Sequence, residues 1–333
     1  MRSRRMLPRR GGLGLAAFAA GALLSAPALA TENGASFYLL GSGGPQAAVV
    51  PPVPGVFFGN TIFYYDGQAQ AGRQLIFNGN VVAGVTGTLA ADFPGVVWVP
   101  TTSVFGGKLV VGGIVPFGQS WVKAQAVLTG PRHNSFTVSA SDTAFVVGDP
   151  VQSTALGWQH GIVHLELANL VNIPIGDYRE GQLANLAFHR WADDLSFAVT
   201  RLDPKDGWDL SAKTGVTFNG ENPATDYRTG TEWHLEAAVE KHITPAFALG
   251  LQAYQFSQVT GDSGSGAKLG PFEGRVTGFG GEAAYNFMIG KIPMTARLHG
   301  TAETNAQNRL QGHSIWFDLS MPLHVHLPPG APG

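Results

Sequence analysis

The chain has 333 residues, of which 44 % are hydrophobic and 13 % charged, with 45 glycines and no cysteine. An exported protein without cysteine has no disulfides, so its stability must come from a large hydrogen-bonded framework. The formal net charge is −2, and without the five arginines of the first ten residues it is 16 minus 23, or −7. That balance argues against a nucleic-acid-binding protein, which would carry a basic face.

Residues 1–30 predict a secretory signal peptide. Five arginines precede the apolar stretch 11–24, and small residues lead to a cleavage site after Ala30. Beyond this leader the chain has no apolar run of about 18 residues, the length that a membrane-spanning helix needs. The protein is therefore expected to be exported, without a helical anchor in its mature part.

Residues 31–54 are rich in glycine and proline, as in 41–45 and 51–54. Proline gives no backbone donor to a sheet, so this stretch cannot be a central strand. Two interpretations stay open for it: a periplasmic tail, or a segment that folds into the mouth of the β-barrel predicted below and partly plugs its lumen.

The first half of the remaining chain gives a mixed signal. Residues 55–66 predict an aromatic strand, and 108–127 predict another after the turn at Gly106-Gly107. Pro94 and Pro100 interrupt 67–105, within which 84–92 could form a helical turn. Residues 132–147 are expected to form a long loop with some strand character.

From Pro150 onward apolar and polar residues alternate clearly. In residues 232–240, for example, Trp233 and Leu235 alternate with His234 and Glu236, which is the period of a strand with two different faces. Short connections are predicted at 157–161, 202–207, 241–245 and 289–291, and long ones at 176–190, 219–230, 258–274 and 302–312. Outer-membrane barrels alternate in this way, with short periplasmic turns and long outer loops.

The last strand, 313–327, shows the pattern most clearly. Its seven odd positions from Ile315 to Leu327 are all apolar, and the positions between them are mostly polar. The stretch is longer than the ~9–11 residues that a tilted strand needs to cross a bilayer. The alternative is a strand that covers the core of a soluble β-sandwich. An edge strand with seven apolar side chains on one face would promote aggregation of a soluble protein.

The pattern predicts an all-β fold, an antiparallel transmembrane β-barrel over 55–327 with a C-terminal tail at 328–333. Counting strands gives about 12, or 14 if 67–105 hides a further pair. Both chain ends are then periplasmic, in the outer membrane of a bacterial cell. The expected partners of such a barrel are outer-membrane lipid and the barrel-assembly machinery, with no nucleic acid.

If the apolar face meets lipid, the polar face lines the lumen. The lumen-lining candidates are His164, Glu166, Asp209, Lys213, Glu232, His234, Glu236, Arg297 and His299. They either pair with one another and with water, or set the polarity of a solute path.

No enzyme is predicted. The sequence has no Gly-x-Ser-x-Gly motif, and the glycine-rich stretch 261–266 has no helix behind it to present amides to a phosphate. His324 and His326 share a strand face, but no third metal ligand is indicated. We therefore expect no catalytic residue, metal or cofactor.

Three predicted loops contain recognisable sequence motifs. They are 172–178, continuing through Asn185 to Trp191, then 219–230 and 258–264, and Gly148-Asp149-Pro150 precedes them. In these segments the chain resembles the meta-pathway phenol-degradation family of outer-membrane proteins, a family of transporters with sphingosine-responsive members. The resemblance implies a barrel akin to long-chain fatty-acid channels, and passive uptake of a small hydrophobic or aromatic compound.

The predicted topology brings these loops together at the outer mouth. The rim candidates are Tyr178, Asn185, Asn222, Asp226, Tyr227 and Asp262. Asn and Asp side chains cap turns, so these residues either only hold the loops in shape or also form the entrance for the solute. The alternative function is a non-transporting barrel with a structural or surface-interaction role.

Overall fold

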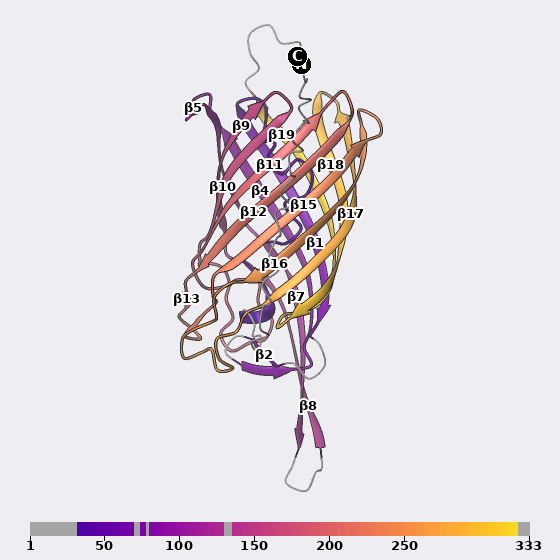
Figure 1. Cartoon of the computed structure of the whole chain (residues 1–333). Helices are drawn as coiled ribbons and strands as arrows, with labels where there is room; N and C mark the ends of the chain where they lie inside the picture. The colour runs from indigo at the N-terminus through magenta and orange to yellow at the C-terminus, as the bar shows by residue number, and fades with distance from the viewer. Residues whose placement is uncertain (1–31, 70–73, 78–79, 130–134, 326–333) are drawn as a thin grey trace, which may run out of the picture.

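The computed structural model describes residues 32–69, 74–77, 80–129 and 135–325. A closed barrel of twelve antiparallel strands dominates it (Figure 1), which confirms the predicted fold class and strand number. In their order around the wall the strands are β1 (Gly55–Gln68), β4 (Thr86–Val99), β6 (Gly107–Ile114), β9 (Val151–His160), β10 (Val163–Asn172), β11 (Ala192–Asp203), β12 (Trp208–Asn219), β15 (Glu232–His242), β16 (Phe247–Gln258), β17 (Arg275–Ile289), β18 (Ile292–Gln307) and β19 (Gln311–Val325). β19 pairs with β1 along its length and closes the wall.

The remaining elements lie inside the barrel or at one of its ends. They are the short 3-10 helix η1 (Glu32–Gly34), β2 (Gln74–Phe77), β3 (Asn80–Ala83), β5 (Ser103–Val104), β7 (Phe117–Thr129), β8 (Ser135–Val147), β13 (Glu221–Asn222) and β14 (Tyr227–Arg228). Within the described ranges, no helix is long and apolar enough to cross a membrane. The predicted signal peptide 1–30, the tail 328–333 and His326 lie outside the described residues.

The strands turn their apolar side chains outward and their polar side chains inward. On β11, Leu195 and Phe197 are about half exposed, whereas Asp194 and Ser196 between them are buried. This arrangement is the reverse of a soluble barrel, because the outer surface is greasy and the interior holds the polar groups. The alternation predicted from the sequence therefore has the in-and-out sense that a lipid-facing wall requires.

Long and short connections lie at opposite ends of the barrel. The long ones, 173–191, 220–231 and 259–274, gather at the lower end in Figure 1, here called the long-loop end, and the opposite end is called the short-turn end. The prediction of a long loop at 302–312 is wrong. β18 and β19 run on through this polar stretch, and only Asn308–Leu310 connect them, with Asn308 in the left-handed conformation that Asn tolerates.

Strand β4 changes its pairing partner close to two prolines. β4 pairs with β6 through Gly95–Trp98 and with β7 through Thr86–Asp92. Pro94, which has no N–H, lies at the changeover, and Pro116 separates β6 from β7. The single strand predicted for 108–127 is therefore two strands, and the helical turn expected at 84–92 is wrong, because pairing with β1 and β7 holds this stretch extended.

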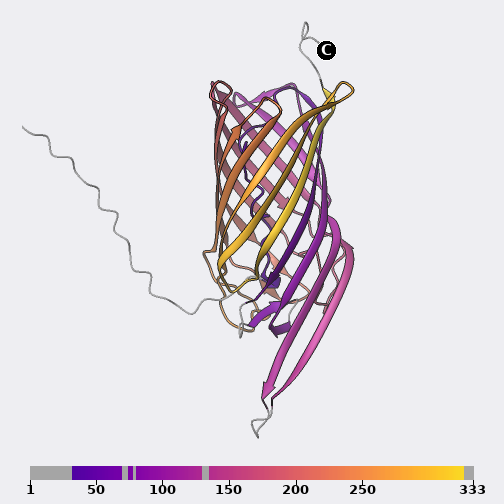
Figure 2. The ribbon, with the colours of Figure 1, turned by 90° about the vertical axis from the view of Figure 1, so that its right-hand side faces the viewer.

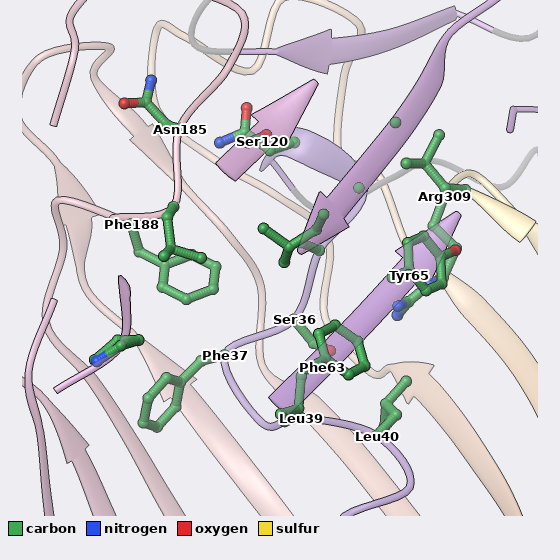
Figure 3. A pocket seen from close by; sticks show the side chains of 18 of the residues that line it. Ser36, Phe37, Leu39, Leu40, Phe63, Tyr65, Ser120, Asn185, Phe188 and Arg309 are labelled. Atoms are coloured by element: carbon green, nitrogen blue, oxygen red, sulfur yellow. The ribbon is translucent and has the colours of Figure 1, made fainter. Parts of the chain in front are cut away.

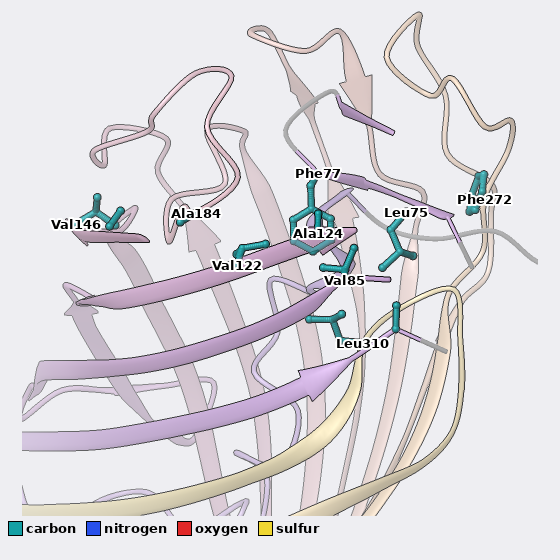
Figure 4. Packing of buried hydrophobic residues seen from close by; sticks show 11 residues of the cluster. Leu75, Phe77, Val85, Val122, Ala124, Val146, Ala184, Phe272 and Leu310 are labelled. Atoms are coloured by element: carbon teal, nitrogen blue, oxygen red, sulfur yellow. The ribbon is translucent and has the colours of Figure 1, made fainter. Parts of the chain in front are cut away.

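β7 and β8 form a hairpin that bends away from the wall and projects beyond the long-loop end (Figure 2). The long loop expected at 132–147 is thus mostly strand β8. The apolar inner face of the hairpin packs against β2 and the tips of the loops (Figure 4). These residues form the outer cluster, which comprises Ala69, Leu75, Phe77, Val85, Val122, Ala124, Ala144, Val146, Ala184, Phe272 and Leu310.

Candidate solute-binding site and path

The glycine- and proline-rich segment 35–54 lies inside the barrel. It runs from η1 at the long-loop end to β1, whose first residue Gly55 pairs with Val325 at the short-turn end (Figure 1). On the way its backbone donates hydrogen bonds to inward-facing side chains of β11, β12 and β15. The segment therefore lies in the lumen rather than hanging from the barrel as a tail, and that it blocks solute as a plug stays a prediction.

The Glu236 carboxylate on β15 holds the middle of this segment. The N–H groups of Gly41 and Gly43 donate to its two oxygens at 2.8 and 2.5 Å. Backbone amides that converge on one anion, here from two residues on either side of Ser42, form a concave anion-binding site. Only glycine suits both positions, because Gly41 has a φ of +96° and a Cβ on Gly43 would come within 2.6 Å of the carboxylate.

Further contacts attach the segment on both sides of Gly41 and Gly43. Gln46 N donates to Asp209 at 3.0 Å, and Ala48 N donates to the Thr200 hydroxyl at 3.1 Å. The Tyr38 ring stacks on the His234 ring, with their centroids 3.5 Å apart. The segment belongs to no strand, so the polar side chains of the wall satisfy backbone donors that would otherwise be buried without partners.

The other lumen-lining candidates form small networks of their own. Lys213 Nζ lies 3.9 Å from Glu166 and 5.7 Å from the centroid of the Tyr38 ring. Arg297 pairs with Glu282 at 2.7 Å, and the two nitrogens of His299 lie within 3.1 Å of Asp318 and Gln252.

Two candidates stand apart from these networks. Glu232, at the long-loop end of β15, accepts a hydrogen bond from Asn219 at 3.3 Å. His164 is half-buried on β10 and joins none of the networks formed by the described residues.

An apolar cavity of about 240 Å³ lies between the start of the segment and the wall (Figure 3). Phe37 and Leu39 of the segment, Phe63 of β1, Phe93 of β4 and Phe188 of loop 173–191 supply much of its lining. For comparison, an apolar cavity of roughly 150 Å³ is enough to hold benzene. The cavity can therefore hold a molecule with one aromatic ring and a substituent.

Sequence reasoning missed this cavity, although one signal was available. Phe37, Tyr38, Leu39 and Leu40 form an apolar run inside a segment otherwise rich in glycine and proline. Such a run in a polar lumen needs an apolar partner, and here Phe37 and Leu39 help to line the cavity.

The two carboxylates that line the cavity are fully engaged by the protein itself. Asp149 accepts hydrogen bonds from the Asn172 side chain and from the N–H groups of Gly176, Phe188 and His189, at 2.8–3.0 Å. Glu303 accepts hydrogen bonds from the hydroxyls of Tyr65 and Tyr254 and from Gly312 N, at 2.8–3.2 Å. Neither carboxylate is left to bind a solute.

Glu32 of η1 joins two of the rim loops. Asn222 donates to it at 3.2 Å and Thr225 at 2.9 Å, and Asn222 also donates to the Tyr178 hydroxyl at 3.1 Å. Burial raises the pKa of the Glu32 carboxyl, which the nearby Arg190 guanidinium partly offsets. Burial also raises the pKa of Tyr178 to about 12. Asn222 thus bonds both to the rim candidate Tyr178 and to Glu32, a residue that the sequence did not single out.

A second rim contact joins loops 220–231 and 259–274. The Tyr227 hydroxyl donates to the Asp262 carboxylate, which also accepts hydrogen bonds from Gly230 N at 3.0 Å and from Gln258 at 2.6 Å. Burial raises the pKa of Asp262 to about 7, although these hydrogen bonds lower it.

The last two rim candidates lie elsewhere. Asn185 closes its own loop through two hydrogen bonds with the backbone of Arg179 and also lines the apolar cavity. Asp226 is exposed on the outside of its loop, where it accepts a hydrogen bond from Ser265 at 3.1 Å. The structure therefore brings together four of the six rim candidates as two pairs, of which Tyr227–Asp262 is buried and Tyr178–Asn222 partly buried.

The comparisons with known proteins fit this architecture. The family model described as "Putative MetA-pathway of phenol degradation" matches residues 71–319. The crystal structure of the COG4313 outer membrane channel from Pseudomonas putida F1 is similar at a TM-score of 0.63 and 14 % identity, covering 83 % of this chain and 98 % of that one.

A more distant likeness is to a Pseudomonas aeruginosa FadL homologue, at a TM-score of 0.42 and 10 % identity, covering 84 % of this chain and 92 % of that one. No curated protein matches the sequence.

Proposed function

The chain belongs to the MetA-pathway phenol-degradation family, and we propose that it is an outer-membrane channel for passive uptake of small hydrophobic or aromatic compounds. The observation that carries the proposal is the apolar cavity of about 240 Å³ inside a barrel whose interior is otherwise polar. A barrel that only displayed loops would need no such space, because side chains would fill its interior.

The similarity to a solved outer membrane channel supports the transport role through the fold that the two chains share. The chain is exported by a signal peptide cleaved after Ala30 and inserted by the barrel-assembly machinery. Its apolar wall faces outer-membrane lipid, and the long-loop end faces outward, as in other barrels of this kind.

The solute path begins at the long-loop end. A compound passes the rim near Tyr178 and Asn222 and rests in the apolar cavity. Its further way to the short-turn end runs through the polar lumen, which residues 41–48 occupy and where Glu236 and Asp209 hold them. The segment therefore acts as a plug that must shift for the solute to pass.

Uptake into intact cells tests the proposal, because the lipopolysaccharide leaflet limits diffusion of hydrophobic compounds that cross ordinary lipid freely. A porin-depleted strain that expresses the full chain is given radiolabelled toluene, phenol and a sugar of similar mass. We expect faster accumulation of the two aromatic compounds and little change for the sugar. Aromatic uptake equal to that of a strain with an empty vector would contradict the channel function.

A further inference from the structure

Arg309 at one end of the apolar cavity has unused hydrogen-bond donors. It belongs to the connection Asn308–Leu310 between β18 and β19, lines the cavity and is only 8 % exposed. Its guanidinium carbon lies 4.5 Å from the centroid of the Phe256 ring. Among the described residues, its Nε and Nη1 have no hydrogen-bond partner. A buried guanidinium normally pairs with an acceptor, because an unpaired buried charge is costly.

The protein's own carboxylates do not meet this need. Asp149 and Glu303, the other charged side chains of the cavity, have their oxygens occupied by the donors described above. Glu232, a third buried carboxylate of this end, accepts from Asn219 through one oxygen, and its other oxygen has no hydrogen-bond partner among the described residues. Within the described part of the chain none of the three forms an ion pair with Arg309, whereas Arg201 and Arg297 each form two.

The space in front of Arg309 is apolar. Figure 3 shows Arg309 beside Tyr65 at one end of the cavity and Phe37 and Phe188 at the other, with Phe63 and Leu39 between them. In a ligand that lies along this axis, the apolar part therefore contacts aromatic rings and the polar end group faces the guanidinium of Arg309. A neutral hydrocarbon would leave the charge unpaired, and a highly charged anion would find no further cation in the lining.

We propose that the cavity binds a small amphiphilic monocarboxylate, which accepts a charge-assisted hydrogen bond from an unpaired donor of Arg309. An ionised acceptor adds a charge attraction that a neutral amide or phenol lacks. The apolar body is one aromatic ring or a short alkyl chain, as the cavity volume allows. This inference rests on the proposed channel function and makes organic acids its preferred substrates, bound more tightly than neutral aromatic compounds.

Benzoate and benzamide test the inference, since they share shape and volume and differ in charge. Their affinities are measured by tryptophan fluorescence on the full chain in lipid nanodiscs. We expect benzoate to bind at least about tenfold more tightly, the typical gain of a hydrogen-bonded charge over a neutral partner. Arg309→Gln should bring benzoate to the level of benzamide and change benzamide by less than about twofold. Arg228→Gln, on an exposed loop position, is the matched control and should change neither.

Octanoate, as a third probe, distinguishes an alkyl from an aromatic acid, and its affinity should also fall in Arg309→Gln. Equal binding of benzoate and benzamide by the unaltered chain would overturn the inference and leave the channel function standing. Failure of benzamide and toluene to bind as well would overturn both. If Arg309→Gln does not fold, as shown by heat-modifiability on gels, the comparison of the two probes on the unaltered chain still decides.

Discussion

Two regions of the barrel interior contact the N-terminal segment 35–54 through different interactions. One is the polar midsection of the lumen, and the other is the apolar cavity at the long-loop end. In the midsection, Glu236, Asp209 and Thr200 hold residues 41–48 by directional hydrogen bonds to backbone N–H groups. In the cavity, Phe37 and Leu39 lie beside aromatic side chains of the wall. Hydrogen bonds fix one position, whereas apolar contacts can be exchanged for those of a solute. The comparison indicates that solute binding and release of the plug are separable.

The largest expected effect is on the cavity wall. Phe63 is 5 % exposed, and its ring centroid lies 4.6 Å from that of Trp316. We expect Phe63→Ala to lower the free energy of unfolding by about 3–5 kcal/mol, as for other buried phenylalanines. The enlarged cavity should then admit naphthalene-sized compounds. Urea unfolding and fluorescence titration measure the two effects, and an unchanged solute size limit would mean that Phe63 does not bound the site.

Removing the acceptor in the midsection should release the plug instead. Glu236→Ala deletes both bonds to Gly41 and Gly43, each worth about 1.5–3 kcal/mol because the acceptor is charged. We expect higher single-channel conductance for small ions and faster hydrogen exchange at residues 41–48. Benzamide affinity should stay within about twofold, far below the effect of losing one such bond. Unchanged conductance would show that the segment does not limit the lumen.

The rim above the cavity should respond to pH. Burial holds the pKa of Asp262 at about 7, above its value of about 4 in an unfolded chain. The folded loops therefore bind this proton more tightly than unfolded loops do. Protonation between these two pKa values stabilises the folded rim, and the stabilisation is lost as the pH rises through about 7. The raised pKa of Glu32 acts in the same direction.

Hydrogen exchange of residues 226–231 and 260–266 at pH 5 and pH 8, corrected for intrinsic rates, measures this effect. We expect greater protection at pH 5 and a weaker pH dependence in Asp262→Asn. Protection that increased with pH would contradict the burial of Asp262 as the cause. The exposed turn at residues 204–207, at the short-turn end, serves as the internal reference.

The smallest effect is expected outside the two regions. Asp226 is exposed, and among the described residues its side chain accepts one hydrogen bond, from Ser265. Asp226→Ala should change the free energy of unfolding by no more than about 0.5 kcal/mol, as for most surface substitutions. Benzamide binding should be unaffected. A larger loss in thermal unfolding would show that this loop supports the cavity more than its contacts indicate.

The sequence predicted the part of the fold in which lipid and lumen impose opposite demands on one strand. After Pro150 each strand has an apolar and a polar face, so the last nine strands and the inward position of residues such as Glu236 could be read directly, and the first half supplied about three more. Family membership could also be recognised from the loops, and the family match confirms it.

Prediction from the sequence failed in segments that do not have one face toward lipid and the other toward the lumen. β8 pairs only with β7 and packs on the outer cluster rather than in the wall, so 132–147 did not show the pattern of a wall strand. β18 and β19 continue past the apolar belt, where polar residues imitate a loop. The cavity was missed because its lining comes from segments far apart in the sequence, and Arg309 lay within a stretch interpreted as a loop.

A reversible lock on the plug tests the central claim most directly. The chain has no cysteine, and a Cβ added at Gly44 would lie 3.8 Å from Cδ of Gln252, so Gly44→Cys with Gln252→Cys places two thiols within reach of a short, reducible bis-methanethiosulfonate cross-linker between the segment and β16. We expect the cross-linked double variant to take up radiolabelled toluene at the rate of cells with an empty vector. Reduction should restore uptake, and the two single variants should be insensitive to the cross-linker. Equal uptake in the cross-linked and reduced states, with the cross-link verified on gels, would contradict a channel whose N-terminal segment must move.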